Sequence, residues 1–468
     1  MKPNKLIFTS AVCLGAMAGA SGLPAQRDGT PKNILIFIAD DLARNELGCY
    51  GGQNVSTPNI DRFAGEGVRF NRMFSSTTMC CPTRASIYTG LYPVTHGVYK
   101  NHGATKTDVK SVVHYFRDMG YRVGLTGKTH FRPKSVYPFE IIDGFEPNCV
   151  ARTADYSTGG IVEFMKRDPE QPFCLFVCST LPHAPWTVGN PAQFDANKLR
   201  LPPQFVDNKE TREAFSRYLA EIDALDRQFG EVLTAIRDAG KESTTLVMFC
   251  GEQGPQFPGG KWTSWDYGQK SAFLVRSPEG YLKGTMSEAM LQYEDVLPTI
   301  ITYAGGKIPD VLQGESFMPV LLGKTSSHRE WAYGVHNNVP EGTPYPIRSI
   351  RNNRYKLIVN LTPEASYFEK HLMAPVKDSY WNAWVRDSKT NETARYWVDR
   401  YITRPAVEFY DITKDPWELD NLASDKKMQS LIHELEKELY KWMDEQGDTG
   451  KELDVDEPVT SAGSPALR

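Results

Sequence analysis

The chain lacks the features of a membrane protein or a nucleic-acid-binding protein. Apart from residues 6–20, no apolar run approaches the ~20 residues that a membrane-spanning helix needs. The 53 basic residues are scattered among 57 acidic ones, and no glycine-rich phosphate loop follows a predicted strand. Internal repeats and low-complexity tracts are absent too. We therefore expect a globular protein with no membrane span and no nucleic-acid partner.

Cysteine is too sparse and too badly spaced for a disulfide framework. The chain has eight cysteines. Cys174 and Cys178 lie four residues apart on one predicted strand, which separates them by ~13 Å, too far for a bridge. Cys49, Cys149 and Cys250 fall in or beside apolar stretches, where free cysteine packs as a small core residue. We predict that these cysteines are unpaired.

Residues 1–25 have the layout of a secretory signal peptide. Lys2 and Lys5 precede the apolar run 6–20, and small residues follow it up to Ala25. This pattern predicts export to a periplasmic or extracellular space. Cleavage after Ala25 would remove two lysines and change the formal net charge from −4 to −6, so a polyanionic partner must be held by local cations. Cys13 lacks the small-residue context of a lipoprotein cleavage site, which disfavours a lipid anchor.

Four short apolar runs, each followed at once by polar residues, predict a parallel sheet. Runs that are apolar on both faces are typical of strands buried in such a sheet, and ligands bind at the carboxyl ends of its strands. Amphipathic helical patterns alternate with the runs, so we expect an α/β fold with helices on both faces. The runs are residues 34–39, 123–125, 173–177 and 246–250, and the two clearest helical patterns are 111–119 and 211–238.

The pattern changes near residue 341. Residues 347–361 and 408–412 read as strands, and 426–446 reads as an amphipathic helix. The tail 447–468, rich in Asp, Pro, Ser and Gly, is predicted to be loosely ordered. We expect a catalytic domain at 26–340 and a smaller α+β subdomain with an antiparallel sheet at 341–468.

The most informative motif is Cys80-Cys-Pro-Thr-Arg84-Ala-Ser-Ile-Tyr-Thr-Gly90. Its purely structural interpretation is a cysteine pair at the start of a helix, with Pro82 in the first turn and Arg84 in an ion pair. The pattern Cys-x-Pro-x-Arg followed by Ala-Ser-x-x-Thr-Gly resembles the signature of the sulfatase family, whose fold is alkaline-phosphatase-like. The resemblance implies that Cys80 is oxidised to formylglycine by a formylglycine-generating or an anaerobic sulfatase-maturating enzyme. The hydrate of that aldehyde has two hydroxyls, one to attack sulfur and one to expel sulfate.

Two acidic motifs resemble the metal site of the same family. The adjacent carboxylates of Asp40 and Asp41 repel one another unless a cation lies between them, and Ca²⁺ prefers such hard oxygen ligands. The alternative is a helix start, where acids offset the macrodipole. Glu252 and Gln253 stand where the family has Asp and then Asn or His, and each is one methylene longer; the alternative here is a surface turn. The resemblance implies one Ca²⁺ held by Asp40, Asp41, Glu252, Gln253 and the matured Cys80.

Three further motifs resemble the sulfate-binding and proton-transfer elements of sulfatases. In Gly127-Lys128-Thr-His130, Lys128 would hold a sulfate oxygen and His130 would take the proton of the second hydroxyl; residues two apart on an extended segment point the same way. His183, in Leu181-Pro-His-Ala-Pro-Trp186, would protonate the leaving group or bind sulfate. Lys261 and Arg84 would add positive charge. A solvated lysine, a core histidine and an ordinary proline loop are the structural alternatives.

Within the family, the likeness is greatest to N-sulfoglucosamine sulfohydrolases. It rests on residues 255–260, 345–350 and 409–422. The resemblance implies removal of an O- or N-sulfate from the end of a sulfated saccharide, a hexosamine of a host or marine glycan, with Arg348 in one of the matching stretches. The polar segment around His336 and Asn337 could hydrogen-bond sugar hydroxyls, and its alternative is an ordinary surface loop. A phosphonate or phosphate ester hydrolase of the same superfamily is one alternative. A non-catalytic glycan-binding protein, in which Cys80 stays a thiol, is the other.

Overall fold

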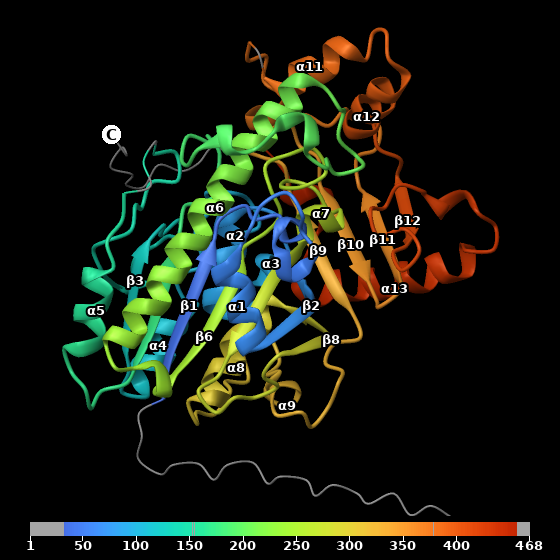
Figure 1. The fold of residues 1–468 in the computed structure, drawn as a ribbon. Helices are drawn as coiled ribbons and strands as arrows, with labels where there is room; N and C mark the ends of the chain where they lie inside the picture. The colour runs from blue at the N-terminus through green and yellow to red at the C-terminus, as the bar shows by residue number, and fades with distance from the viewer. Residues whose placement is uncertain (1–31, 152, 154, 378, 456–468) are drawn as a thin grey trace, which may run out of the picture. The chain divides into compact units, whose positions relative to one another are not determined.

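An eight-stranded sheet forms the centre of the computed structural model, which describes residues 32–151, 153, 155–377 and 379–455 (Figure 1). Its strand order is β4-β3-β5-β1-β6-β7-β2-β8. Neighbouring strands are parallel, except that β7 runs antiparallel to both β6 and β2. The predicted mostly parallel sheet is therefore confirmed. The strands are β1 Asn33–Ala39, β2 Val68–Phe74, β3 Arg122–Gly127, β4 Glu140–Ile141, β5 Phe173–Cys178, β6 Thr245–Gly251, β7 Lys270–Arg276 and β8 Thr285–Gln292.

Helices cover both faces of this sheet because its central strands are apolar on both sides. Along β1, Leu35 and Phe37 pack into the core shared with α1, α5 and α6, while Ile34 and Ile36 pack toward α2, α4 and α8. The long helix α6 runs along the front of the sheet (Figure 1). The helices are α1 Pro58–Glu66, α2 Cys80–Thr89, α3 Pro93–His96, α4 Val112–Asp118, α5 Gly159–Lys166, α6 Lys209–Asp238, α7 Asp266–Gln269, α8 Val296–Tyr303 and α9 Met318–Leu321.

A second, antiparallel sheet has the strand order β12-β11-β10-β9. Its strands are β9 Ala332–His336, β10 Ile347–Arg351, β11 Tyr355–Asn360 and β12 Val407–Asp411. One face packs on α13 Gln429–Gln446 through Leu435 and Leu439. The remaining helices are α10 Lys370–Met373, α11 Tyr380–Asp387 and α12 Glu392–Ile402. The predicted antiparallel sheet is present, although it begins at Ala332, before the predicted boundary at 341, which itself stays a prediction.

The tail predicted to be loose is packed as far as residue 455. The side chain of Asp448 accepts hydrogen bonds from the guanidinium of Arg348. Asp454 is 1% exposed and accepts from the backbone amides of Asn338, Val339 and Tyr345. The prediction was wrong here because polar composition suggested solvent exposure, whereas these acids satisfy buried donors. Residues 456–468 lie outside the described residues.

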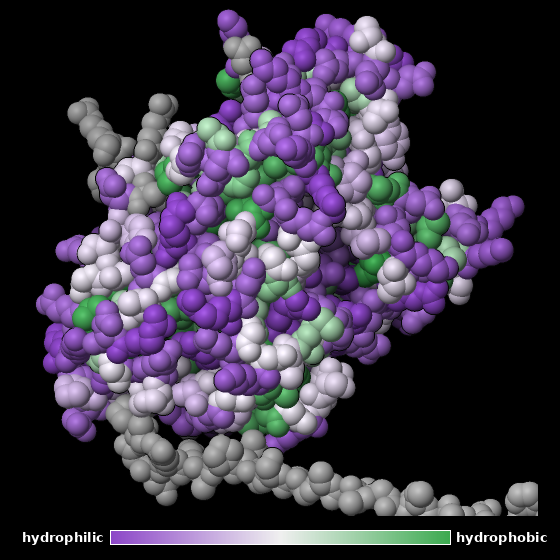
Figure 2. Space-filling model, viewed as in Figure 1, coloured by the Kyte–Doolittle hydropathy of each residue, from purple (hydrophilic) through white to green (hydrophobic). Residues whose placement is uncertain are grey.

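Two expectations about the whole chain can be compared with the described residues. The seven cysteines among them are all unpaired, while Cys13 lies outside, with the rest of the predicted signal peptide. In those same ranges no helix combines the length and the apolar character that crossing a membrane requires. Hydrophilic residues dominate the face seen in Figure 2, and apolar ones form small separate groups on it.

Candidate active site

The sequence-predicted site residues meet at one edge of the large sheet. Asp40 and Asp41 follow β1, Lys128 follows β3, His183 lies in the loop after β5, and Glu252 follows β6. The register brings these strand ends level, since Ala39 pairs with Gly251, and Cys178 pairs with both Ile38 and Gly127. The first residue of α2, Cys80, lies at the same edge. The sheet therefore brings together residues that are up to 212 positions apart.

Cys80 lies at the centre of this group. It is 1% exposed, and its Sγ lies 3.5 Å from Oδ1 of Asp40, 3.8 Å from Oδ1 of Asp41 and 3.2 Å from Nε2 of Gln253. Burial raises the pKa of the Cys80 thiol, against the opposing charges of Lys128 and Lys261. A protonated thiol is a poor nucleophile. Residue 80 thus lies at the centre of the site, but as an unmodified cysteine it would be a poor nucleophile there.

Three buried carboxylates around Cys80 each have a cationic partner. Nζ of Lys128 lies 2.5 Å from Asp40, Nζ of Lys261 lies 2.8 Å from Asp41, and Nη2 of Arg84 lies 2.5 Å from Glu252. Burial disfavours the charged form of Asp40, but the charges of Lys128, His183 and Arg84 outweigh it and hold the pKa of Asp40 well below its usual range. The three positive and three negative side chains balance one another.

The donor set fits a hard divalent cation. Ligand atoms of Asp40, Cys80 and Glu252 lie within 4.8 Å of one another. Glu252 Oε1 is buried without a hydrogen-bond partner, and burial raises the pKa of this carboxyl, which a nearby cation would reverse. The amide of Gln253 directs Nε2 at Asp41 and Oε1 at the Thr83 hydroxyl, 2.9 and 3.1 Å away. A rotation of the Gln253 amide by 180° would direct Oε1 at Asp41 and Nε2 at Thr83. The Thr83 hydroxyl permits this rotation because it can accept a hydrogen bond as well as donate one. The longer Glu-Gln pair therefore still reaches the site.

The two predicted histidines flank this centre. Nδ1 of His183 donates to the carbonyl of Ala184, so Nε2 faces the site, 3.2 Å from Nζ of Lys261 and 3.6 Å from Asp41. The ring of His130 lies on the side of Lys128. Burial and the charge of Lys128 lower the pKa of His130 well below its usual value, which keeps the imidazole neutral near pH 7.

The expected reason for the placement of Lys128 and His130 was wrong. We predicted an extended segment with both side chains on one side. Instead Gly127 and His130 have φ angles of 84° and 42°, so the chain turns sharply directly after β3. Lys128 points to Asp40, and His130 reaches the site by the turn rather than by strand alternation.

Sequence reasoning missed a group of polar residues next to His130. Nδ1 of His102 lies 3.0 Å from Nε2 of His130, and Nε2 of His102 lies 3.3 Å from the fully buried Glu341. Glu341 also contacts His371 Nε2 at 2.6 Å and Asn101 Nδ2 at 2.5 Å. These contacts hold the pKa of Glu341 well below its usual value although burial opposes ionisation. No local motif marks these residues, since they come from distant segments.

Cys149 was predicted as a core residue and lies at the site instead. Its Sγ belongs to a group with Asp40 and His183 whose ligand atoms are within 4.8 Å of one another. Burial would raise the pKa of this thiol, but Lys128 and His183 lower it to about 7. Pro147 and Asn148, which precede it, are typical of turns, and this was the available signal against a core position.

The three expected sugar contacts are buried, and two of them have internal hydrogen-bond partners. His336, Asn337 and Arg348 are at most 1% exposed. The guanidinium of Arg348 donates to Asp448 and to the side-chain oxygen of Asn337. Burial and the charge of Arg404 lower the pKa of His336 to about 3. A substrate cannot reach these side chains in this conformation, so we do not include them in the substrate proposal.

Comparisons with known proteins match nearly the whole chain. A family model described as "Sulfatase" matches residues 32–306, and one described as "N-sulphoglucosamine sulphohydrolase, C-terminal" matches 261–372. An ulvan-active sulfatase of Formosa agariphila is 32% identical, over 91% of this chain and 83% of its own. The human N-sulphoglucosamine sulphohydrolase is 28% identical, over 88% and 90%. A protein solved with its substrate D-glucosamine-2-N,6-O-disulfate has the same fold, with a TM-score of 0.69, 19% identity, and coverage of 92% of this chain and 100% of that one.

Proposed function

The chain belongs to the sulfatase family and is a sulfuric ester hydrolase, and on that premise we propose that it removes sulfate from a saccharide by means of a formylglycine at residue 80 and one Ca²⁺ ion. The observation that carries this proposal is the position of Cys80, at the start of α2 among the carboxylates of Asp40, Asp41 and Glu252. Because its raised pKa keeps the Cys80 thiol protonated, an unmodified cysteine would not act as a nucleophile at this position, whereas a converted side chain could.

Asp40, Asp41, Glu252 and Gln253 would hold the Ca²⁺ together with residue 80. The ion would supply positive charge beside residue 80 and beside the sulfate oxygens. The charges of the site support this: the carboxylates and cations already pair with one another, so the positive charge of a bound divalent cation would be left to attract the anionic sulfate group of the substrate.

The chain's own cations would orient the sulfate and stabilise charge that develops during transfer. Lys128 and Lys261 are buried on either side of Cys80, and both raise the stability of an anion there. Burial would lower the pKa of Lys261, but Asp41 outweighs it, so this lysine stays charged. Arg84 is fixed by Glu252 and faces the same centre. These side chains would orient the sulfate group next to residue 80.

The two histidines would move the protons. His183 presents Nε2 to the site while Nδ1 keeps its proton on the carbonyl of Ala184, so the doubly protonated imidazolium would donate the Nε2 proton to the leaving oxygen or nitrogen once a sulfate oxygen takes over the contact from Lys261. The formylglycine hydrate would supply the two hydroxyls, one for attack and one for release. His130 would accept the proton of the second hydroxyl, because its imidazole is neutral near pH 7.

We infer that the substrate is a saccharide with a terminal sulfated hexosamine. The names of two similar proteins point to saccharide sulfates, and the match to the C-terminal model of N-sulphoglucosamine sulphohydrolase includes Glu341 and His371. His371 and His102 are 44% and 57% exposed, so their rings can contact a sugar that enters beside His130.

A panel of sulfated sugars tests this substrate. Sulfate release would be measured from N-, 3-O- and 6-O-sulfated glucosamine and from sulfated galactose and uronate, each as a mono- and a disaccharide. We expect the highest kcat/KM for a glucosamine sulfate, because buried polar groups reject a sugar that leaves them unpaired. A preference for galactose or uronate sulfates, or for internal sulfates of a polymer, would overturn the sugar assignment.

We also propose that residues 1–25 direct export. The mature protein would then begin at Gln26 in the periplasm or the medium. N-terminal sequencing of the protein recovered from those fractions tests this, and an intact Met1 terminus in the cytoplasm would contradict it.

A further inference from the structure

A second cavity lies apart from Cys80 and its partners. It has a volume of about 390 Å³, and its walls include Arg44, Tyr50, Asp266 and Lys270. None of the proposed catalytic or metal-binding residues lines it. Figure 2 shows a hollow on this face in the region where Figure 1 labels α7. The cavity is large enough for a sugar residue and waters.

Cationic side chains outnumber acidic ones in the wall of this cavity. Nζ of Lys270 makes no hydrogen bond or ion pair with the described part of the chain. Burial, with help from Arg44, outweighs the opposing charge of Asp266 and lowers the pKa of Lys270 to about 8. Asp266, the one acid among the lining residues, is already held by Arg351 at 2.5 Å and by Lys356 at 2.7 Å. Nε of Arg44 is buried without a partner. An anion that entered here would meet the unpaired ammonium group of Lys270 and the unpaired Nε–H of Arg44, whose Nη1 already donates to the carbonyl of Asn71.

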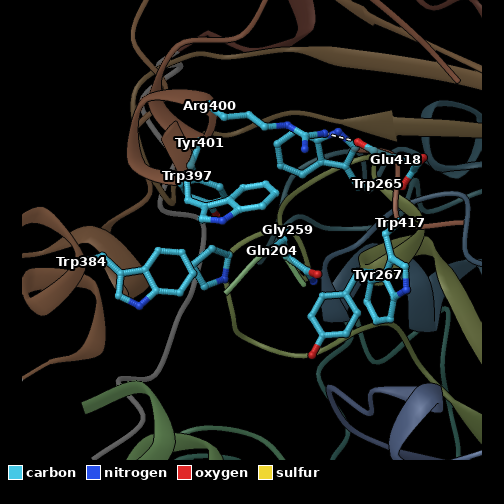
Figure 3. A pocket seen from close by; sticks show the side chains of 11 residues that line it. Gln204, Gly259, Trp265, Tyr267, Trp384, Trp397, Arg400, Tyr401, Trp417 and Glu418 are labelled. Carbon is cyan, nitrogen blue, oxygen red and sulfur yellow. Dashed lines mark hydrogen bonds between the residues drawn. The ribbon is translucent and has the colours of Figure 1, made fainter. Parts of the chain in front are cut away.

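Aromatic rings form the wall next to these cations. The rings of Tyr267 and Trp417 lie 5.8 Å apart, and both residues also line an adjoining narrow slot (Figure 3). In that slot the amide of Gln204 has neither its oxygen nor its nitrogen paired, although the residue is only 9% exposed, and the hydroxyl of Tyr267 is unpaired too. Flat apolar rings beside a few unpaired polar groups are typical of sites that hold a sugar ring.

The cavity and the catalytic centre share one segment of chain. Residues 254–268 leave the sheet after Gln253 and return to it at β7, with the amide of Gly254 bonded to the carbonyl of Gly268 at 2.7 Å. Lys261 in this segment points to Asp41, while Asp266 and Tyr267 line the cavity. A saccharide that occupies both places would therefore contact the two sides of a single loop.

We propose that this cavity binds an anionic sugar residue, bearing sulfate or carboxylate, at a site separate from the catalytic one. The ligand class rests on the proposed function, since the anion would be a second charged residue of a sulfated saccharide. Lys270 and Arg44 hold the anionic group, and Trp417 and Tyr267 pack on the ring. The amide of Gln204 takes a polar substituent in the adjoining slot.

Binding to full-length Cys80→Ala protein tests the site without turnover. A sulfated hexasaccharide of alternating glucosamine and uronate is titrated by calorimetry into this protein and into versions that also carry Lys270→Met or Trp417→Ala. Lys324→Met, which removes an exposed lysine, is the matched control. We expect Lys270→Met to weaken binding by about tenfold, as the loss of a charge-assisted contact implies, and Lys324→Met to leave it unchanged. Equal affinities in all four proteins would overturn the proposal.

Kinetics with Cys80 intact separate this site from the catalytic one. Lys270→Met should raise KM for the hexasaccharide about fivefold or more at unchanged kcat, because uniform binding is lost, and should leave a sulfated monosaccharide unaffected. Hexasaccharide turnover with an unchanged KM refutes the second site but not the proposed function. Absence of turnover on every saccharide refutes the function, while the calorimetry still reports on the cavity. AMP serves as a probe that joins an anionic group to an aromatic ring. If it bound in a manner that depends on Lys270 while the hexasaccharide did not bind, the saccharide assignment would be overturned.

Discussion

Nδ1 of His102 lies 3.0 Å from Nε2 of His130, which joins the proposed proton acceptor to an exposed histidine of another loop. His102 in turn contacts the fully buried carboxylate of Glu341. A histidine that bonds a carboxylate through one nitrogen has the tautomer of its other nitrogen fixed. The pair His102–Glu341 therefore orients the ring of His130, and neither member of the pair needs to touch the reacting atoms.

The first prediction concerns pH. Burial and the nearby positive groups keep the pKa of His130 low, so kcat, which includes the sulfate release that His130 assists, should rise with pH through a value well below 6.5. His102→Asn, which tolerates the local φ of 57°, removes one of those groups and should move this acid limb to higher pH. His433→Asn on the exposed face of α13 is the control. Superimposable pH profiles of the wild type and His102→Asn would show that His102 has no such role.

The second prediction concerns the metal. Gln253→Leu keeps the size of the side chain and removes its oxygen, so the dialysed protein should lose bound calcium and most activity. Gln253→Asn, with an amide one methylene shorter, should retain part of both. Elemental analysis after dialysis, followed by calcium titration of activity, gives the answer. Full calcium content and activity in Gln253→Leu would remove this residue from the metal site.

The third prediction separates the two histidines by leaving group. His183→Ala should reduce kcat on a saccharide sulfate by about 10²-fold or more, because an alkoxide leaves poorly without a proton. An aryl sulfate with an acidic phenol needs no such help and should lose much less. Parallel kinetics on the two substrates measure the difference. An equal loss on both would mean that His183 binds sulfate rather than protonating the leaving group.

The fourth prediction tests the structural role of Arg348. Asp448→Ala leaves this guanidinium buried without its partner carboxylate and should lower the free energy of unfolding by about 3–5 kcal/mol. Asp444→Ala, at an exposed position nearby on α13, should cost far less. Denaturant unfolding of the two variants makes the comparison. A small loss in Asp448→Ala would reopen a functional role for Arg348.

Much of the sheet and of its edge could be predicted from local patterns. The run before Asp40 and the run before Glu252 are apolar on both faces, so their strands and their shared edge followed from the sequence. Cys80, Lys128 and Lys261 lie in recognisable short motifs. The contact between His102 and His130 could not be predicted, because it depends on two turns with positive φ. Glu341 belongs to the connection between β9 and β10, and only tertiary packing brings it to the site.

Burial was the other property that the sequence hid. The segment around His336 and Asn337 is polar and read as a surface for sugar hydroxyls. In the structure Asp448 of the tail pairs with Arg348, and Asp454 accepts from backbone amides of this segment. Polar side chains that bind a ligand and polar side chains that bond to a distant part of the chain look alike in the sequence, so the sequence alone does not separate the two cases.

Peptide mass spectrometry of residue 80 in the active, purified enzyme is the most direct test of the mechanism. Conversion of Cys80 to formylglycine replaces SH and one hydrogen by an aldehyde oxygen, so the peptide should show loss of sulfur and two hydrogens and gain of oxygen at this residue, with Cys81 unchanged. Cys80→Ala should then be folded and inactive. An unmodified thiol at residue 80 in fully active enzyme would contradict the proposed mechanism.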